Sequence, residues 1–325
     1  MARILSGMRP TGRLHLGNYT GALENWVRLQ ASHESFHMVA DWHALTTGYE
    51  HTEHLREDTH EMVADWIAAG IDPEKSPVFI QSHIKEHAEL HLLFSMIVTK
   101  ARLERNPALK EQLRDLGLEE NVTYGHLGYP VLQAADILMY KATAVPVGED
   151  QVPHVELTRE IARRFNLLYG PIFPEPDALL TKFARLVGLD GNRMSKSLGN
   201  TILISDAPEA IQSKVKTAYT DPLKIRKNDP GHPEGCVVFA YHGKFNDSEV
   251  ARIEVDCRSG AIGCVACKQN LATKLAASLA PLRERRVTIA DRPGYVEEAL
   301  AHGEERARAV AQKTMAEVRD AVRLP

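Results

Sequence analysis

The sequence predicts an α/β fold, a doubly wound parallel sheet joined to a second, mostly helical domain. Three observations lead to this prediction. The chain has 325 residues, a length that suits roughly two domains. Short β-like runs alternate with helical patterns through its first half, as expected for a parallel sheet covered by helices. Beyond about residue 200, helical patterns dominate.

Each element of the first half is marked by its periodicity and its end signals. A short strand at 2–5 runs into a glycine-rich turn, and the later strands are predicted in this order: 35–40, 77–80 and 145–147. Apolar residues at helical spacing predict the helices between and after them: 55–67, 90–98 and 157–165. Gly70 and the Asp72–Pro73 pair end the first of these helices. This alternation is typical of a Rossmann-type sheet.

The second half predicts long helices. Leu271, Leu275, Leu279 and Leu282 share one helical face, and another stripe runs from Val296 to Val322. The boundary falls in the stretch 170–200, which is rich in Gly, Pro and Asp. We therefore expect the sheet domain over residues 1–185 and a loop-plus-helices domain over residues 186–325.

Composition narrows the class of protein. Apolar residues make up 44% and charged residues 25% of the chain, which is ordinary for a globular protein. The 39 basic and 43 acidic residues leave a formal charge of −4, so any nucleic-acid site must be a local basic patch. Apolar runs stay well short of about 18 residues, which argues against a membrane span. The first residues have no long apolar run, so we expect a cytoplasmic protein.

A glycine-rich loop near the start can bind phosphate. Four glycines lie within the 15 residues 7–21, where the first strand gives way to a helix expected from about Gly17. Glycine allows the backbone to approach a ligand closely, and a helix N-terminus offers free N–H groups to an anion. His15 can add an imidazole donor. Taken alone, the loop can equally be a strand–helix turn carrying a surface histidine.

A second loop is cationic and contains serines. It spans Gly191–Ser197 and is followed by Gly199. Lysine supplies a point charge and arginine a planar fork, so such a loop can close over a triphosphate. Taken alone, it can equally be a solvated basic loop.

The two loops together resemble the signatures of class I aminoacyl-tRNA synthetases. His15–Asn18 (HLGN) is similar to their HIGH signature, and Arg193–Ser197 (RMSKS) to their KMSKS loop. Asn18 and Arg193 depart from those patterns, but both retain a hydrogen-bond donor. The resemblance implies that the chain binds ATP.

Segments in the middle of the chain resemble one family of that class, the tryptophanyl-tRNA synthetases. They are Ala40–Ala44 (ADWHA), Tyr129–Asp136 (YPVLQAAD) and Val145–Gln151 (VPVGEDQ). The chemistry is consistent, because an indole N–H only donates and Asp136 can accept at the end of a buried pocket. Tyrosyl-tRNA synthetases remain the alternative, since a Gln–x–x–Asp pair also suits a phenol.

The resemblance implies roles for individual residues. Those expected in catalysis are Lys196, Arg193, His15 and Lys110. Those expected to bind ATP are Arg9, His15, Gly17, Asn18, Asp150, Gln151, Arg193, Met194, Ser195 and Lys196. Those expected to bind tryptophan are Leu5, Gly7, His43, Tyr129, Gln133, Asp136, Val145, Val147 and Gln151. Tyr129 and Gln151 are expected near the ammonium group. Adenylate formation needs no general base, since a carboxylate is already ionised, so catalysis should be positioning and charge stabilisation.

The family also implies partners. Mg²⁺ is expected with ATP, bridging phosphate oxygens while keeping its waters. The helical domain should read the tRNA anticodon, with local basic runs at 214–227 and 283–286 as candidate phosphate contacts. A homodimer is expected by family resemblance.

Four cysteines lie within residues 236–267: Cys236, Cys257, Cys264 and Cys267. Four thiolates suit either tetrahedral zinc or a 4Fe–4S cluster, so the number of ligands does not choose between them. Some bacterial tryptophanyl-tRNA synthetases carry a similar four-cysteine pattern bound to a 4Fe–4S cluster, and this resemblance favours the cluster, with zinc as the alternative.

Two other functional classes are alternatives. A nucleotidyltransferase of the same superfamily would use the first loop without charging tRNA, but the helical second domain and the Val145–Gln151 segment argue against it. A non-catalytic RNA-binding relative would be expected to lose His15 or the lysine loop, and both are present.

Overall fold

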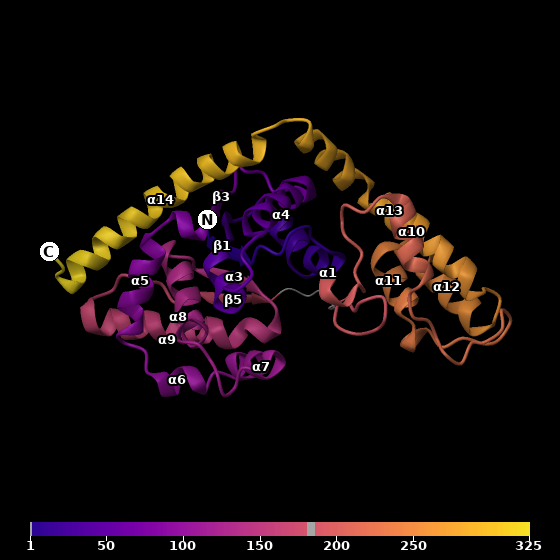
Figure 1. Cartoon of the computed structure of the whole chain (residues 1–325), viewed down its shortest axis with the longest axis horizontal. Helices are drawn as coiled ribbons and strands as arrows, with labels where there is room; N and C mark the ends of the chain where they lie inside the picture. Colours follow the sequence, from indigo (N-terminus) through magenta and orange to yellow (C-terminus); the bar gives the residue numbers. More distant parts are fainter. Residues whose placement is uncertain (1, 181–185) are drawn as a thin grey trace. The chain divides into compact units, whose positions relative to one another are not determined.

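The computed structural model describes residues 2–180 and 186–325, and these form two compact units (Figure 1). The first unit contains residues 2–12, 24–180 and 292–325, and the second contains residues 13–23 and 186–291. The two units are therefore interleaved along the chain. The expected boundary after residue 185 lies outside the described residues.

The first unit is built on a five-stranded sheet in the order β3-β2-β1-β4-β5, and every pairing is parallel. Its strands are β1 (Arg3–Met8), β2 (Glu34–Val39), β3 (Val78–Ile80), β4 (Ala144–Val147) and β5 (Asp177–Leu180). The strand order reverses between β1 and β4, and in open parallel sheets ligands bind beyond the carboxyl ends at such a point. This confirms the predicted α/β class. β5 was not predicted.

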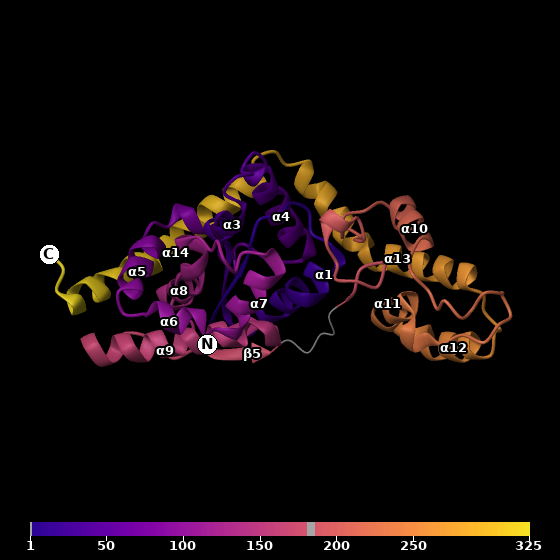
Figure 2. The same cartoon turned by 60° about the horizontal axis from the view of Figure 1, so that its bottom comes forward.

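Helices cover this sheet and bury its apolar side chains. They are α2 (Glu24–Leu29), α3 (Asp41–Gly48), α4 (Leu55–Ala69), α5 (Glu86–Ser95), α6 (Lys100–Glu104), α7 (Pro107–Leu116), α8 (Tyr124–Met139), α9 (Val152–Tyr169) and α14 (Tyr295–Val322), with short 3₁₀ turns at Gln81–His83 and Glu149–Gln151. α4 ends at Gly70 in the left-handed conformation (φ 119°), as the glycine predicted. The stripe of Leu157, Ile161 and Phe165 on α9 is buried, and Figure 2 shows this helix beside β5.

The last helix, α14, differs from the expectation that all later residues belong to a second domain. It returns to the first unit and packs along β3 (Figure 1). A Cβ on Gly303 would lie 1.9 Å from the Val78 carbonyl oxygen, so glycine permits this close approach. Arg306 donates to the carbonyls of Pro73 and Glu74. An amphipathic helix needs a partner for its apolar face, but its pattern does not say which partner.

The second unit is mostly helical, as predicted. It contains α1 (Leu16–Asn18), a π-helical turn at Tyr19–Leu23, 3₁₀ turns at Lys196–Leu198 and Pro233–Gly235, α10 (Pro208–Lys216), α11 (Val237–Phe245), α12 (Asp247–Arg258) and α13 (Cys264–Ala290). The predicted leucine stripe of α13 is buried against its neighbours. Among the described residues, no helix is long and apolar enough to cross a lipid bilayer.

Candidate active site

Polar side chains follow the carboxyl ends of four strands in the first unit. Arg9 follows β1, Asp41 and His43 follow β2, Gln81 follows β3, and Gly148–Gln151 follows β4. The Asp41 carboxylate links two of these strand ends, since its Oδ1 accepts from the backbone N–H groups of Trp42 and Ser82, each at 3.0 Å. These residues meet at the edge of the sheet where ligands of this fold bind.

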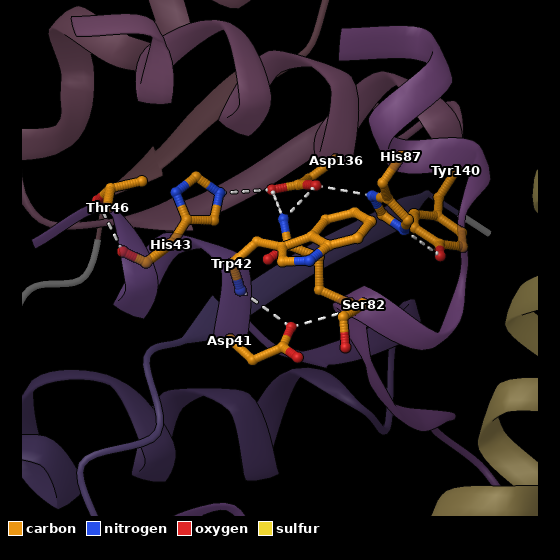
Figure 3. A network of polar contacts seen from close by, with 9 residues as sticks. Asp41, Trp42, His43, Thr46, Ser82, His87, Asp136 and Tyr140 are labelled. Atoms are coloured by element: carbon orange, nitrogen blue, oxygen red, sulfur yellow. Dashed lines mark hydrogen bonds and ion pairs between the residues drawn. The ribbon is translucent and has the colours of Figure 1, made fainter. Parts of the chain in front are cut away.

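Asp136, on α8, is the centre of a buried polar network (Figure 3). Its Oδ2 lies 2.7 Å from His43 Nε2, and its Oδ1 lies 2.7 Å from His87 Nδ1. Gln81 Nε2 donates to both oxygens, at 2.8 and 3.0 Å. The structure thus brings together two residues predicted for the tryptophan pocket, Asp136 and His43, with two that sequence reasoning missed.

This network keeps Asp136 ionised. Burial alone would raise the pKa of its carboxyl group, but the hydrogen bonds from His43 and His87 outweigh burial and hold that pKa well below its usual range. His87 Nε2 in turn lies 2.8 Å from the Tyr140 hydroxyl, which is also buried. The result is a fixed carboxylate that only accepts hydrogen bonds.

The donors to Asp136 differ in exposure. The side chain of His87 is 0% exposed and Gln81 is 0% exposed, whereas the His43 side chain is 12% exposed. His43 is therefore the donor that a ligand can reach. Leu5, Val145 and Val147, which were predicted to contact tryptophan, are buried in the apolar core of this unit.

Tyr129, two turns before Asp136 on the same helix, belongs to a second hydrogen-bonded chain. Its hydroxyl lies 2.7 Å from His154 Nε2, and His154 Nδ1 lies 3.4 Å from Asn106 Nδ2. Burial raises the pKa of Tyr129 above its ordinary value, so its hydroxyl stays protonated at neutral pH. His154 and Asn106 were not predicted as site residues. The Asn106–Pro107 pair is a helix-start signal that could have drawn attention to this position.

The other residues predicted for this unit lie as follows. Gln133 is half-buried on α8, one turn before Asp136. Gly7 lies against Met38, where a Cβ would come within 3.2 Å of its side chain. Gln151 Nε2 donates to Asp150 at 3.1 Å, and Gly148 leaves room for that carboxylate. Lys110 is exposed on α7.

In the second unit, the HLGN turn closes on itself. Asn18 N–H donates to His15 Nδ1 at 3.3 Å, and His15 N–H donates to Asn18 Oδ1 at 3.1 Å. Because Nδ1 accepts, the proton of the neutral ring sits on Nε2, which can donate to a ligand. Asn18, the departure from the HIGH pattern, thus caps the turn through its side chain.

The RMSKS loop lies against this turn. The Met194 thioether is 3.2 Å from the Gly17 backbone nitrogen, and a Cβ on Gly17 would crowd both Met194 and the His15 ring. Burial, followed by the Lys196 cation, lowers the pKa of His15 to about 4, so its ring is neutral at pH 7. The structure therefore brings the two signature segments together.

Asn200, which sequence reasoning missed, organises the base of that loop. Its Oδ1 accepts from the Ser195 N–H at 2.8 Å, and its Nδ2 donates to the Arg193 carbonyl at 3.0 Å and to Asp190 at 2.8 Å. Gly191 and Gly199 flank the loop with positive φ angles of 87° and 65°. The sequence indicated the two glycines, but it did not indicate that Asn200 holds the loop between them by hydrogen bonds.

The four cysteines line one cavity of about 20 Å³ in the second unit, together with apolar Val238, Phe239, Ile253 and Ile262. All four are free thiols. Burial, and then the charges of the other three cysteines, raise the pKa of Cys267 to about 12, which reflects how closely the thiols gather. In the described part of the chain, no three His, Cys, Asp or Glu side chains have a geometry that could hold a metal ion. Coordination would therefore require these side chains to turn.

One basic residue predicted to contact tRNA lies elsewhere. Lys224 is buried, lines the cysteine cavity and donates to the Asp229 carbonyl. Its amine is thus committed within the protein and does not contribute to a surface patch.

Known proteins are similar to this chain over nearly its whole length. Residues 1–280 match the family described as tRNA synthetases class I (W and Y). The tryptophan–tRNA ligase of Thermotoga maritima is 53% identical and covers 99% of each chain. That of Aquifex aeolicus is 47% identical and covers 99% of this chain and 100% of its own. A tryptophanyl-tRNA synthetase from Campylobacter jejuni, solved with ADP and tryptophan, is 33% identical with a TM-score of 0.88, and the match covers 99% of this chain and 100% of that one.

Proposed function

The chain belongs to the class I tRNA synthetases for tryptophan and tyrosine, and from this premise we propose that it is a tryptophan–tRNA ligase. It activates tryptophan with ATP, releasing pyrophosphate, and then transfers tryptophan to a ribose hydroxyl of its tRNA. Full-length similarity to tryptophan–tRNA ligases supports this reading over the tyrosine alternative.

The observation that carries the choice of amino acid is the ionised, buried Asp136. An indole N–H can only donate, and this carboxylate can only accept. His43 and Gln81 already occupy Oδ2, and His43 is the exposed one of the two, so we propose that the indole N–H takes the place of His43 there. Phenylalanine brings no donor, so a phenyl ring that displaced His43 would leave the carboxylate underpaired, which is a strong basis for rejection.

The signature segments of the second unit supply charge stabilisation for ATP. His15, neutral and protonated on Nε2, donates to a phosphate oxygen, while Lys196 and Arg193 offset the charge of the departing pyrophosphate. Gly17, Asn18, Met194 and Ser195 shape the backbone around these groups. Mg²⁺ bound with ATP would neutralise part of the charge on the phosphates.

The remaining predicted residues keep their proposed roles. Arg9, Lys110 and Asp150 act on the nucleotide. Gln151 and Tyr129 bind the ammonium group, and Gln133 completes the pocket beside Asp136. Leu5, Gly7, Val145 and Val147 form its apolar wall. The attacking carboxylate is already ionised, so these residues position the substrates and none acts as a general base.

ATP–pyrophosphate exchange with single amino acids tests this function. We expect exchange with tryptophan and little with tyrosine or phenylalanine, followed by charging of tRNA for tryptophan. Lys196→Ala is the matched inactive control, with exchange slowed by roughly 10²–10³ at unchanged tryptophan binding. Faster exchange with tyrosine than with tryptophan would transfer the assignment to the alternative.

Partners and location follow the same proposal. We propose that the helical second unit, within residues 186–325, reads the tRNA anticodon, while the sheet unit, largely within residues 1–185, binds ATP and tryptophan. We also propose a homodimer that works in the cytoplasm.

We propose in addition that the four cysteines bind one structural 4Fe–4S cluster, with zinc as the alternative. All four line one cavity, whose other lining residues are four apolar side chains and Thr220, Asp221 and Lys224. Beside Cys257, Gly231 leaves a space that a Cβ would fill, because that atom would lie 2.5 Å from the sulfur. His242 Nε2 lies 3.4 Å from the Cys267 sulfur and can donate to a thiolate there. When bound, the cluster would cross-link the segments before α11, in α12 and in α13.

Anaerobic purification tests the metal centre. The cluster predicts brown protein with absorption near about 400 nm and roughly four irons per chain. Cys257→Ser should lose both the absorption and the iron. Colourless wild-type protein with one zinc would mean that the four cysteines bind zinc in place of the cluster. Wild-type protein with neither iron nor zinc would show that the four cysteines bind no metal.

A further inference from the structure

His154 stands out as a buried polar residue that the proposed chemistry has not used. It is 1% exposed and lies on α9, and its ring packs edge-on against the Tyr129 ring at 5.2 Å between centroids. Its Nε2 is 2.7 Å from the Tyr129 hydroxyl. In the described fold, the Tyr129 hydroxyl is thus hydrogen-bonded to this imidazole.

The proton positions in this chain follow from the cap of α7. Asn106 Oδ1 accepts from the backbone N–H groups of Ala108 and Leu109, at 3.0 and 3.4 Å. The oxygen side of the amide is therefore fixed at the helix start, and Nδ2 must face His154 and the Pro153 carbonyl. Because an amide NH₂ only donates, His154 Nδ1 accepts, and the ring proton sits on Nε2.

It follows that His154 donates to Tyr129, and not the reverse. The Tyr129 oxygen accepts the Nε2 proton through one lone pair. Its other lone pair, and its own O–H, then point in fixed directions. Burial lowers the pKa of His154 to about 4, so the imidazole keeps this neutral form at physiological pH.

We propose that His154 is a positioning residue for recognition of the substrate ammonium group: it fixes the Tyr129 hydroxyl so that its free lone pair accepts from that group. The inference rests on the proposed binding of an amino acid ammonium group by Tyr129. It also gives Asn106 two tasks, since the side chain that caps the Lys110 helix sets the tautomer of His154. Cap and pocket are therefore held by one hydrogen-bonded chain.

His154→Leu removes the donor, and His154→Gln retains one, because glutamine Nε2 can occupy the place of the imidazole Nε2. We expect His154→Leu to raise the KM for tryptophan in pyrophosphate exchange roughly tenfold with kcat changed less than about threefold. His154→Gln should stay within about threefold of wild type. Equal melting temperatures for the two variants would show that both are folded.

Two competitive inhibitors separate positioning from general pocket damage. Tryptamine carries the indole and the ammonium group, and indole-3-propionate carries the indole and the carboxylate. His154→Leu should weaken tryptamine by the same factor as tryptophan and leave indole-3-propionate unchanged. In a Tyr129→Phe background, the same substitution should add no further loss, because the positioned hydroxyl is already gone.

Equal weakening of both inhibitors would overturn the inference and make His154 a packing residue. An additional loss in the Tyr129→Phe background would overturn it too. The wild-type reaction with tryptophan is a separate reference: without that exchange the proposed function itself fails, whatever the variants do.

Discussion

At the scale of single residues, Asp136 is a charge that the protein keeps buried. Hydrogen bonds from Gln81, His87 and His43 compensate for its desolvation. Such a group is expensive to disturb, because removal of any one donor leaves the carboxylate underpaired. The need of this buried carboxylate for donors therefore explains both its selectivity for a ligand N–H and the free energy lost when a donor is removed.

Asp136→Asn should weaken the binding of tryptophan while preserving the size of the side chain. Hydrogen bonds to charged groups contribute about 1.5–3 kcal/mol, so we expect the KM for tryptophan to rise roughly 10- to 100-fold. The preference for tryptophan over phenylalanine should fall by a similar factor, since phenylalanine makes no use of the acceptor. Pyrophosphate exchange with each amino acid measures both. Unaltered selectivity in the variant would place the indole partner elsewhere.

Sequence reasoning reached Asp136 and His43 but not the residues that hold them. Their segments resemble a known family, whereas Gln81 and His87 gain meaning only when the turn after β3 is folded beside α8. His154 lies just after the Val145–Gln151 segment, yet its role depends on Asn106, which is 48 residues away in sequence. Hydrogen bonds between distant residues are set by tertiary packing, and no local pattern encodes them.

At the scale of elements, the HLGN turn and the RMSKS loop are joined by packing as well as by charge. Met194 is buried against Gly17, and the room for its thioether exists because residue 17 has no side chain. Gly17, which was predicted to allow close approach of phosphate, therefore also leaves room for the Met194 side chain.

Gly17→Ala tests this contact, with Gly21→Ala as the matched control. The new methyl at residue 17 would lie 3.1 Å from the His15 ring and 3.2 Å from the Met194 sulfur, while residue 21 has open space. We expect the first variant to lose roughly tenfold or more in kcat for exchange, by displacement of His15, and the second to lose less than about twofold. Equal losses would mean that the seat of Met194 does not position the loop.

The elements also show how far periodicity reaches. Most strands and long helices were predicted within a few residues, because apolar spacing and the Gly70 stop signal are local. The edge strand β5 was missed, since its four residues are only partly buried and carry no clear alternation.

At the scale of the whole molecule, neutral buried histidines make stability depend on pH. Burial lowers the pKa of His37 to about 3 and that of His154 to about 4. The unfolded chain binds these protons at an ordinary pKa near 6.5, so unfolding takes up protons below that pH. The contribution of these neutral histidines to the free energy of unfolding is therefore full above about pH 6.5 and falls as the pH drops toward 4.

Urea unfolding should reveal this dependence. Each of the two histidines should remove about 2 kcal/mol of stability between pH 7.5 and pH 5. His37→Phe retains a ring stacked near Trp26 and removes one of these titrating groups, so its stability should fall by about 2 kcal/mol less over the same interval. A variant with the wild-type pH dependence would show that His37 does not take up a proton on unfolding.

Gly303→Ala tests the return of α14 to the sheet. The added methyl would meet the Val78 backbone, which cannot turn aside as a side chain can. We expect a loss of about 1–3 kcal/mol in the free energy of unfolding, typical of overpacking. Gly48→Ala, where a Cβ has open space, is the control and should change stability by less than about 0.5 kcal/mol. Equal stability of the two variants would mean that α14 can shift without cost.

The position of α14 has a consequence for synthesis on the ribosome. The helix that covers the β3 edge is encoded after the whole of the second unit. Until residues near 303 leave the exit tunnel, the nascent chain presents an uncovered strand edge, which is a template for pairing with other chains. A chain released after residue 291 should therefore contain the whole second unit, while its first unit, which lacks α14, still needs a chaperone.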